Sequence, residues 1–281
     1  MTCIKEDLIT IFDKKIYIKM WVPENVTSIV PIILIHDSLG CVDLWKDFPQ
    51  ELSKKTSRRV IAYDRLGFGK SDSCIEQPSI NFIKEEAEIV FPALRKQLSI
   101  KNYILLGHSV GGGIALNIAA KDKACLGIIS ISAQAFIEDV TIAGIQKAQK
   151  FFSQNNQIKR LEKWHGAKAK WVLSAWVDIW LSSEFSQWNL SYCIHDVMCP
   201  TLVIHGDKDE YGTVAFPQYI SKNVSGDSEN LILKDCGHMP HKEKPTEILN
   251  AIVNFFYLNS ASKRLTDEWL VSTLPKKIKK Q

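Results

Sequence analysis

Apolar and polar residues follow patterns along this chain that predict strands and helices in turn. Residues 8–22 alternate between apolar and polar positions, which predicts one or two antiparallel strands. Short apolar runs predict buried strands at residues 31–35, 59–63, 103–106, 126–131, 200–204 and 231–233. Helical spacing separates these runs, from about residue 44, over 79–98, from residue 111 and over 246–258. This alternation predicts the α/β class, with a mostly parallel, doubly wound sheet that helices cover on both faces.

Residues 134–198 interrupt the alternation. They carry long helical patterns and five of the eight tryptophans, and they fall between two predicted strands of the core. We therefore expect residues 1–133 and 199–260 to form the core, and residues 134–198 to form an inserted helical cap. The aromatic residues of this cap either attach it to the core or wall an apolar substrate pocket. The candidates for the pocket are Trp164, Trp171, Trp176 and Trp180, of which the last two share a helix face.

The composition is that of one large globular domain. A chain of 281 residues with 46% hydrophobic residues can bury a sizeable α/β core. No apolar run reaches the roughly 18 residues of a membrane span, and the first residues lack the apolar segment of a signal peptide. The seven cysteines are odd in number and show no C-x-x-C spacing, which favours free thiols in a reducing compartment. We expect a cytoplasmic protein without a membrane span.

The net charge of +4 comes from the carboxyl-terminal end of the sequence. Residues 261–281 contain six Lys or Arg and two acidic residues, so the rest of the chain is close to neutral. A neutral body lacks the basic surface that nucleic-acid binding requires. We expect residues 261–281 to form a basic, solvated tail and the protein to bind no nucleic acid. The sequence gives no indication of the oligomeric state.

A G-x-S-x-G motif stands between a predicted strand and a predicted helix, at Gly107-His108-Ser109-Val110-Gly111. The turn from strand to helix is sharp, and a side chain at either glycine would collide with the strand or the helix. This turn holds a serine hydroxyl at the carboxyl end of the sheet, in front of a helix amino terminus. Both features favour attack on a carbonyl group and stabilisation of the anion that forms. The motif therefore predicts Ser109 as a nucleophile.

Further motifs follow the order found in one superfamily. Asp64 to Ser71 match the pattern D-x-x-G-x-G-x-S, and Gly237 to Pro245 match G-H-x-x-x-x-E-x-P. An early loop at residues 36–40 follows a predicted strand. Together with the elbow, these motifs resemble the α/β-hydrolase fold superfamily, in particular a serine esterase-like member with a helical cap, over roughly residues 10–258.

The resemblance implies a Ser-His-Asp triad in the chain order serine, acid, histidine. Asp207 and Asp209 both follow a late predicted strand, and the superfamily pattern G-x-x-D selects Asp209. His238 follows a glycine in the carboxyl-terminal loop, and we expect its rival His241 to pack or to face solvent. The predicted triad is Ser109, His238 and Asp209.

The resemblance also implies an oxyanion hole made of two backbone N–H groups, those of Val110 and Ser38. The superfamily usually has glycine after the histidine of the early loop, whereas this chain has Asp37. Aspartate tolerates a positive φ better than most residues, but a carboxylate aimed into the site would oppose formation of an oxyanion. We therefore expect Asp37 to point away from the site.

The function that the resemblance implies is hydrolysis of a carboxylic ester or thioester through an acyl-enzyme. The aromatic cap favours a small-molecule ester with an apolar acyl or aryl group, and the serine in the elbow argues against relatives that use an aspartate there. The same triad also serves C–C bond hydrolases, perhydrolases and a lyase, and some members of the superfamily are small-molecule receptors with little turnover. No histidine pair has the spacing of zinc ligands with a third ligand, so we expect no metal and no cofactor.

Overall fold

The computed structural model describes residues 2–154 and 156–261, with the side chains of residues 260 and 261 excepted. Within these residues, eight strands form one sheet in the order β1-β2-β4-β3-β5-β6-β7-β8. Strands β3 to β8 run parallel, whereas β1 and β2 form an antiparallel hairpin whose second strand is antiparallel to β4. The strands are β1 (Cys3–Ile11), β2 (Lys14–Val22), β3 (Ser28–Ile35), β4 (Arg58–Tyr63), β5 (Tyr103–His108), β6 (Cys125–Ile131), β7 (Thr201–Gly206) and β8 (Ser228–Leu233). The predicted, mostly parallel sheet is confirmed.

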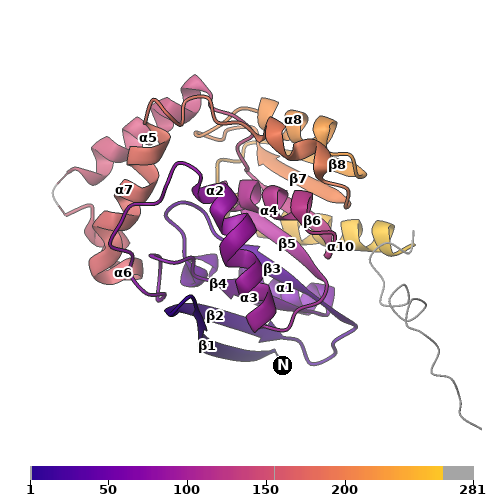
Figure 1. Ribbon diagram of the computed structural model, residues 1–281. Coiled ribbons are helices and arrows are strands. Elements are labelled where there is room, and N and C mark those ends of the chain that lie inside the picture. The colour runs from indigo at the N-terminus through magenta and orange to yellow at the C-terminus, as the bar shows by residue number, and fades with distance from the viewer. Residues whose placement is uncertain (1, 155, 262–281) are drawn as a thin grey trace, which may run out of the picture.

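Helices cover both faces of this sheet (Figure 1). Helices α1 (Phe48–Thr56) and α10 (Pro245–Ala261) pack together on one face. The other face carries α2 (Phe82–Glu85), α3 (Phe91–Gln97), α4 (Val110–Lys121) and α8 (Ala215–Asn223). Because successive side chains of a strand point to opposite faces, β3 contributes to two cores. Ile33 and Ile35 pack in the core beneath α4, and Ile32 and Leu34 pack in the core beneath α1 and α10.

Two helices differ in detail from the sequence patterns. The helix expected from about residue 44 is a 3₁₀ turn, η1 (Val42–Trp45), followed by α1, which has a proline in its first turn. The helix expected over residues 79–98 consists of α2, a π-helical turn η2 (Glu86–Val90) and α3. Pro92 lacks the N–H that would bond to the Glu88 carbonyl, which gives a physical reason for the wider turn at this point.

The segment between β6 and β7 is mainly helical. It contains α5 (Asp139–Phe152), α6 (Lys159–His165), η3 (Gly166–Lys168) and α7 (Ala169–Trp180), followed by η4 (Leu190–Tyr192) and η5 (Ile194–Asp196). Figure 1 shows α5, α6 and α7 grouped to one side of the sheet. Residues of α5 and α7 line a cavity together with residues that follow β3, β5, β6, β7 and β8. These helices therefore lie over the carboxyl edge of the sheet, where parallel strands present their functional loops.

No helix among the residues that the structure describes is both long enough and apolar enough to span a bilayer. The sequence-predicted basic tail, residues 261–281, lies outside the described residues except for Ala261, the last residue of α10. The remaining short helix, α9 (Pro240–Glu243), follows the loop that carries His238.

Candidate active site

Ser109 sits at the turn between β5 and α4. Its φ of 56° lies in the left-handed region, which is strained for a residue other than glycine. The Ser109 N–H donates to Ile131 O at 2.8 Å and so ties the turn to β6. A Cβ at Gly107 would stand 2.1 Å from Gly111 O, and one at Gly111 would stand 2.2 Å from Ile35 O. The turn therefore closes only with glycine on both sides, and it brings Ser109 to the wall of a cavity.

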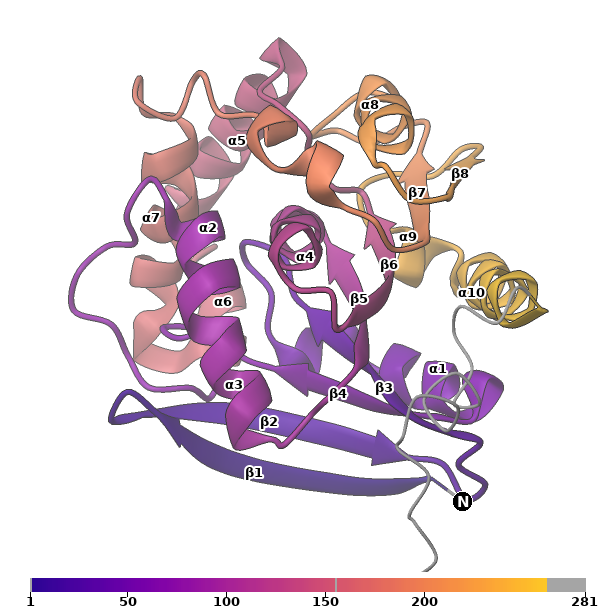
Figure 2. The same cartoon turned by 45° about the vertical axis from the view of Figure 1, so that its right-hand side comes forward.

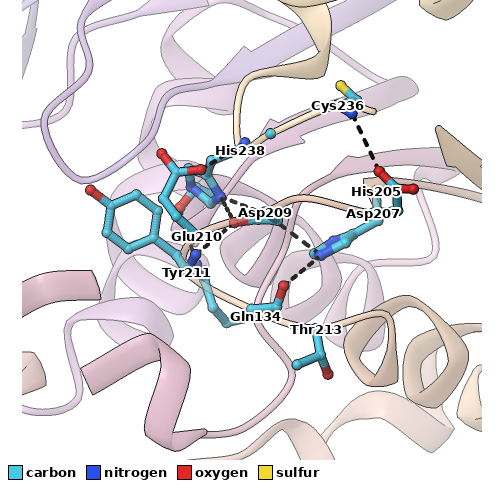
Figure 3. A network of polar contacts seen from close by, with 12 residues as sticks. Gln134, His205, Asp207, Asp209, Glu210, Tyr211, Thr213, Cys236 and His238 are labelled. Atoms are coloured by element: carbon cyan, nitrogen blue, oxygen red, sulfur yellow. Dashed lines mark hydrogen bonds and ion pairs between the residues drawn. The ribbon is translucent and has the colours of Figure 1, made fainter. Parts of the chain in front are cut away.

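His238 and Asp209 are joined by a buried hydrogen bond. His238 follows β8 and Asp209 follows β7, so two neighbouring parallel strands bring them to the same edge of the sheet. His238 Nδ1 lies 2.8 Å from Asp209 Oδ2 and 2.9 Å from Oδ1 (Figure 3). The Tyr211 N–H donates to Asp209 Oδ1 at 2.8 Å, and His205 Nε2 lies 3.4 Å from Oδ2. With Nδ1 donating to a carboxylate, Nε2 of the neutral His238 ring is free to accept a proton.

Asp207, the other candidate carboxylate, is turned away from His238. Its Oδ1 accepts from the Cys236 N–H at 3.4 Å, as Figure 3 shows, and its own N–H donates to Leu233 O. The structure therefore pairs His238 with Asp209 and uses Asp207 in the turn after β7. Across the described residues, no group of three or more His, Cys, Asp or Glu side chains is placed to hold a metal ion.

The contact between His238 and Asp209 shifts their pKa values in opposite directions. Burial lowers the pKa of His238, but the hydrogen bond and negative charge of Asp209 outweigh burial and raise it above its usual 6.5. Burial raises the pKa of Asp209, but the hydrogen bond and charge of His238 outweigh burial and lower it below its usual 3.8. The pair thus keeps Asp209 ionised and makes His238 a stronger base than a free imidazole.

Ser109 and His238 line the same cavity, which has a volume of about 100 Å³. No hydrogen bond joins them in the described part of the chain, and Ser109 Oγ instead accepts from Gln134 Nε2 at 3.4 Å. The ring of Tyr211 stands edge-on to His238, with 4.8 Å between their centroids. Sequence reasoning did not single out Gln134 or Tyr211. The one feature of the sequence that could have indicated either residue is its position a few residues after a buried strand of the parallel sheet.

Two backbone N–H groups beside Ser109 have no hydrogen-bond acceptor within the residues described. They belong to Ser38, in the loop after β3, and to Val110, the first residue of α4. Ser38 lines the cavity together with Ser109. The amino terminus of α4 adds the positive end of a helix dipole. The arrangement can therefore stabilise negative charge that develops next to the serine.

Comparison with known protein families agrees with this geometry. A family model described as "alpha/beta hydrolase fold" matches residues 30–157 of the chain. This range begins in β3, contains Ser38 and Ser109, and ends before Asp209 and His238. The chain has the fold of the α/β-hydrolases, and its residues 30–157 match the family of that description.

The individual relatives differ in how much of this chain they match. A proline iminopeptidase of Lactobacillus helveticus is 24% identical over 259 residues, which cover 77% of this chain and 86% of that protein. The Arabidopsis thaliana protein named "Probable lysophospholipase BODYGUARD 3" is 27% identical over 108 residues, 38% of this chain and only 21% of that protein. The crystal structure of a proline iminopeptidase from Mycobacterium smegmatis has a TM-score of 0.75 at 19% identity and covers 92% of this chain and 100% of that chain. This structural likeness establishes the fold.

Asp37 stands where α/β-hydrolases usually have a glycine, and it is one of the residues that line the cavity. That its carboxylate points away from the oxyanion site stays a prediction. Asp37 Oδ1 accepts from the Leu39 N–H at 3.1 Å, and Oδ2 lies 3.1 Å from His108 Nδ1. His108 is 1% exposed, and its Nε2 lies 2.7 Å from the carbonyl oxygen of His238. The loop after β3 is thus connected through the elbow residue His108 to the loop that carries His238.

The contact with His108 also affects the ionisation of Asp37. Burial raises the pKa of Asp37, but the hydrogen bond and charge interaction with His108 outweigh burial and lower it below its usual 3.8. Asp37 is therefore ionised, and its carboxylate is held between the Leu39 N–H and the ring of His108.

The four candidate pocket tryptophans occupy different places. Trp176 and Trp180 of α7 line the cavity at Ser109. Trp171 lies five residues before Trp176, on another face of the same helix, and lines a second cavity of about 360 Å³. Trp164 of α6 lines neither of these two cavities, and Lys46 Nζ lies over its ring at 3.8 Å from the centroid. Helical periodicity explains why only the pair spaced by four residues shares one wall.

Proposed function

We propose that the protein is a serine hydrolase that cleaves a carboxylic ester or thioester through an acyl-enzyme. The observation that carries this proposal is the buried hydrogen bond between His238 Nδ1 and Asp209, beside the strained turn that holds Ser109. A serine hydroxyl is a weak nucleophile unless an adjacent base removes its proton, and the base needs an orienting acid. The raised pKa of His238 supports its role as that base.

In the first half-reaction, the Ser109 hydroxyl oxygen attacks the ester carbonyl carbon while His238 Nε2 takes the hydroxyl proton. The carbonyl π electrons move to the oxygen, where the N–H groups of Ser38 and Val110 stabilise the negative charge. The bond to the alcohol oxygen then breaks, and His238 gives the proton to the leaving alcohol. Because Ser109 Oγ contacts Gln134 in the free protein, we expect its side chain to rotate toward His238 when substrate binds.

In the second half-reaction, His238 takes a proton from a water molecule whose oxygen attacks the acyl carbonyl carbon. The same two N–H groups hold the second oxyanion. The bond to Ser109 Oγ breaks, and His238 returns the proton to the serine. Asp209 stays ionised throughout and stabilises the imidazolium that forms twice in each cycle.

The substrate that this site favours is small and has an apolar group next to the scissile bond. The cavity has apolar walls, which come from Leu39, Ile145, Trp176 and Trp180. No lysine or arginine is among the described residues that line it. Such walls favour an acyl or aryl group over a sugar or a phosphate. We assign the α5–α7 segment, in residues 134–198, the role of a cap over the core, because α5 and α7 supply the wall opposite the elbow.

Amide hydrolysis is the second candidate function. It is favoured by the alignment of 77% of this chain with proteins named proline iminopeptidase. The same nucleophile, base and oxyanion donors serve an amide, because an ester and an amide of the same acid differ only in the leaving group and form the same acyl-enzyme. An amine leaving group makes greater demands on His238 as a proton donor.

Rapid-mixing kinetics with p-nitrophenyl acetate, butyrate and octanoate test the proposed function. We expect a burst of p-nitrophenol equal to the enzyme concentration, followed by slower turnover, because deacylation is a separate step. Ser109→Ala should reduce kcat by a factor on the order of 10⁶ and leave the thermal midpoint nearly unchanged. Ester cleavage that survives this substitution would rule out the assigned nucleophile. Faster cleavage of proline 4-nitroanilide than of any of the three esters would favour the amide alternative.

A further inference from the structure

A second cavity, which we call the side chamber, adjoins the cavity at Ser109. It has a volume of about 360 Å³ and shares the walls Ser38, Trp176 and Trp180 with the first cavity. Its other walls come from the loop after β4, residues 74–79, the helix formed by α2 and η2, and α7. Figure 2 shows α2 beside α7 on this side of the molecule. The side chamber therefore borders the cavity at Ser109 along Ser38 and two tryptophans of α7.

Two buried, oppositely charged side chains line the side chamber without touching each other. Arg65 is 5% exposed and Glu86 is 7% exposed, and no ion pair joins them in the described residues. Arg65 Nη2 donates to the Asp37 carbonyl oxygen at 3.0 Å, and its buried Nε has no partner. Glu86 Oε1 accepts from the Tyr63 hydroxyl at 2.7 Å. Burial raises the pKa of Glu86 above its usual 4.5 in spite of Arg65 and the Tyr63 hydrogen bond, so the residues described do not fully satisfy either group. Incomplete pairing of buried polar groups is costly, which indicates a site for a bound polar group.

The backbone at Glu86 supports this interpretation. Glu86 is the first residue of the π-helical turn η2, and such turns occur frequently at functional sites. The turn places Glu86 in the wall of the side chamber, whereas Glu88 of the same turn is exposed and lies outside it. Of the two acidic residues in this turn, Glu86 alone lines the side chamber.

The charges restrict the chemistry of the bound group. A carboxylate in the side chamber would face Glu86 and also Glu76 and Glu85, which line it as well. An ammonium group would face the buried Arg65. A neutral group that offers both an acceptor and a donor can satisfy Arg65 and Glu86 together. A carboxamide is such a group, because its carbonyl oxygen accepts from the guanidinium and its N–H donates to the carboxylate.

The direction of the proposed reaction decides which part of the substrate enters the side chamber. The leaving alcohol takes its proton from His238, which lines the first cavity and not the side chamber. We therefore place the far end of the acyl chain on the side of Ser38, the residue of the oxyanion site that lines both cavities. We propose that the side chamber binds a carboxamide in the acyl chain of the substrate, between Arg65 and Glu86; this inference rests on the proposed ester hydrolysis.

A matched series of esters tests this assignment. The probes are ethyl esters of ω-acetamido acids of two, four and six carbons, each paired with the ethyl alkanoate of equal chain length. We expect kcat/KM to favour the acetamido ester at one chain length. Glu86→Gln should reduce that preference about tenfold, chiefly by raising KM, because the glutamine amide presents a donor to the substrate N–H. The new side chain still accepts from Tyr63, so the fold is retained.

Glu88→Gln is the matched control, since it makes the same substitution two residues away on an exposed position. It should leave the preference unchanged. An unchanged preference in Glu86→Gln at every chain length would overturn the assignment, as would a stronger preference for ω-amino or ω-carboxy esters. Calorimetric binding of the same esters to Ser109→Ala separates the two proposals. Tight binding that weakens with Glu86→Gln, without turnover in the unaltered protein, would reject ester hydrolysis and retain the side-chamber site.

Discussion

Two Asp–His pairs meet at this site, and they differ in what the second ring nitrogen contacts. His238 binds Asp209 through Nδ1, and its Nε2 has no protein partner among the residues described. His108 also contacts its carboxylate, Asp37, through Nδ1, but its Nε2 is held by the carbonyl oxygen of His238 at 2.7 Å. The two ring centroids are 5.1 Å apart. Only His238 can exchange a proton with a substrate without losing a hydrogen bond to the protein.

This difference shows that residue type and pairing do not by themselves define a catalytic base. Both histidines are buried and both have an ionised partner. In the proposed reaction His238 is the base, because the cavity lies on its remaining side. His108 joins the loop after β3 to the loop after β8 through the turn that carries Ser109. The predictions below separate these two roles.

The largest effect is expected from Asp209→Asn. The amide side chain keeps the size of the carboxylate but favours the wrong tautomer of His238 and no longer stabilises the imidazolium. By analogy with the loss measured for this change in the serine-protease triad, kcat should fall by about 10³- to 10⁴-fold. Steady-state kinetics with a p-nitrophenyl ester measures the loss, and KM should change little.

Asp207→Asn is the control for this variant, because it makes the same substitution two residues earlier in the same turn. Asp207 contacts the Cys236 N–H and not His238, so kcat should stay within about twofold of the unaltered protein. Equal losses in both variants would mean that the turn after β7, and not the Asp209–His238 pair, determines the rate.

The contrast between the pairs also shows what the sequence can predict. The parallel sheet is predictable because each apolar run is local, and the motif after β7 selects Asp209, the carboxylate that contacts His238. The contact between Asp37 and His108 is not predictable in this way. It depends on how two loops, 71 residues apart in the chain, meet at the edge of the sheet. The side-chamber pair of Arg65 and Glu86 depends equally on tertiary packing and on a π turn that helical periodicity does not reveal.

A smaller effect on activity is expected when the pH is lowered. His238 must be neutral to accept a proton, so kcat/KM should fall as pH drops through its pKa. Because Asp209 raises that pKa, the half-maximal point should lie above pH 6.5, with about a tenfold loss for each further pH unit below it. Asp209→Asn should move this acid limb to lower pH. A limb that does not move would assign the titration to another group.

The smallest effects are expected from substitutions of Asp37. A comparison of two of them separates the contribution of its charge from that of its hydrogen bonds. Asparagine can still accept from the Leu39 N–H and can form a hydrogen bond with His108 Nδ1, so that the contact of His108 Nε2 with the His238 carbonyl oxygen is kept. Alanine cannot do either. Asp37→Ala should therefore lower the free energy of unfolding by about 2 kcal/mol and kcat about tenfold, whereas Asp37→Asn should cost less than about 1 kcal/mol.

Denaturant unfolding at pH 7 measures both losses. If asparagine were as damaging as alanine, the ion pair itself would hold the loops together. If asparagine were nearly neutral, hydrogen bonding would hold them, and the carboxylate would act mainly by its charge, which contributes to the raised pKa of His238. In that case the acid limb of Asp37→Asn should still shift toward lower pH, although the protein is as stable as before.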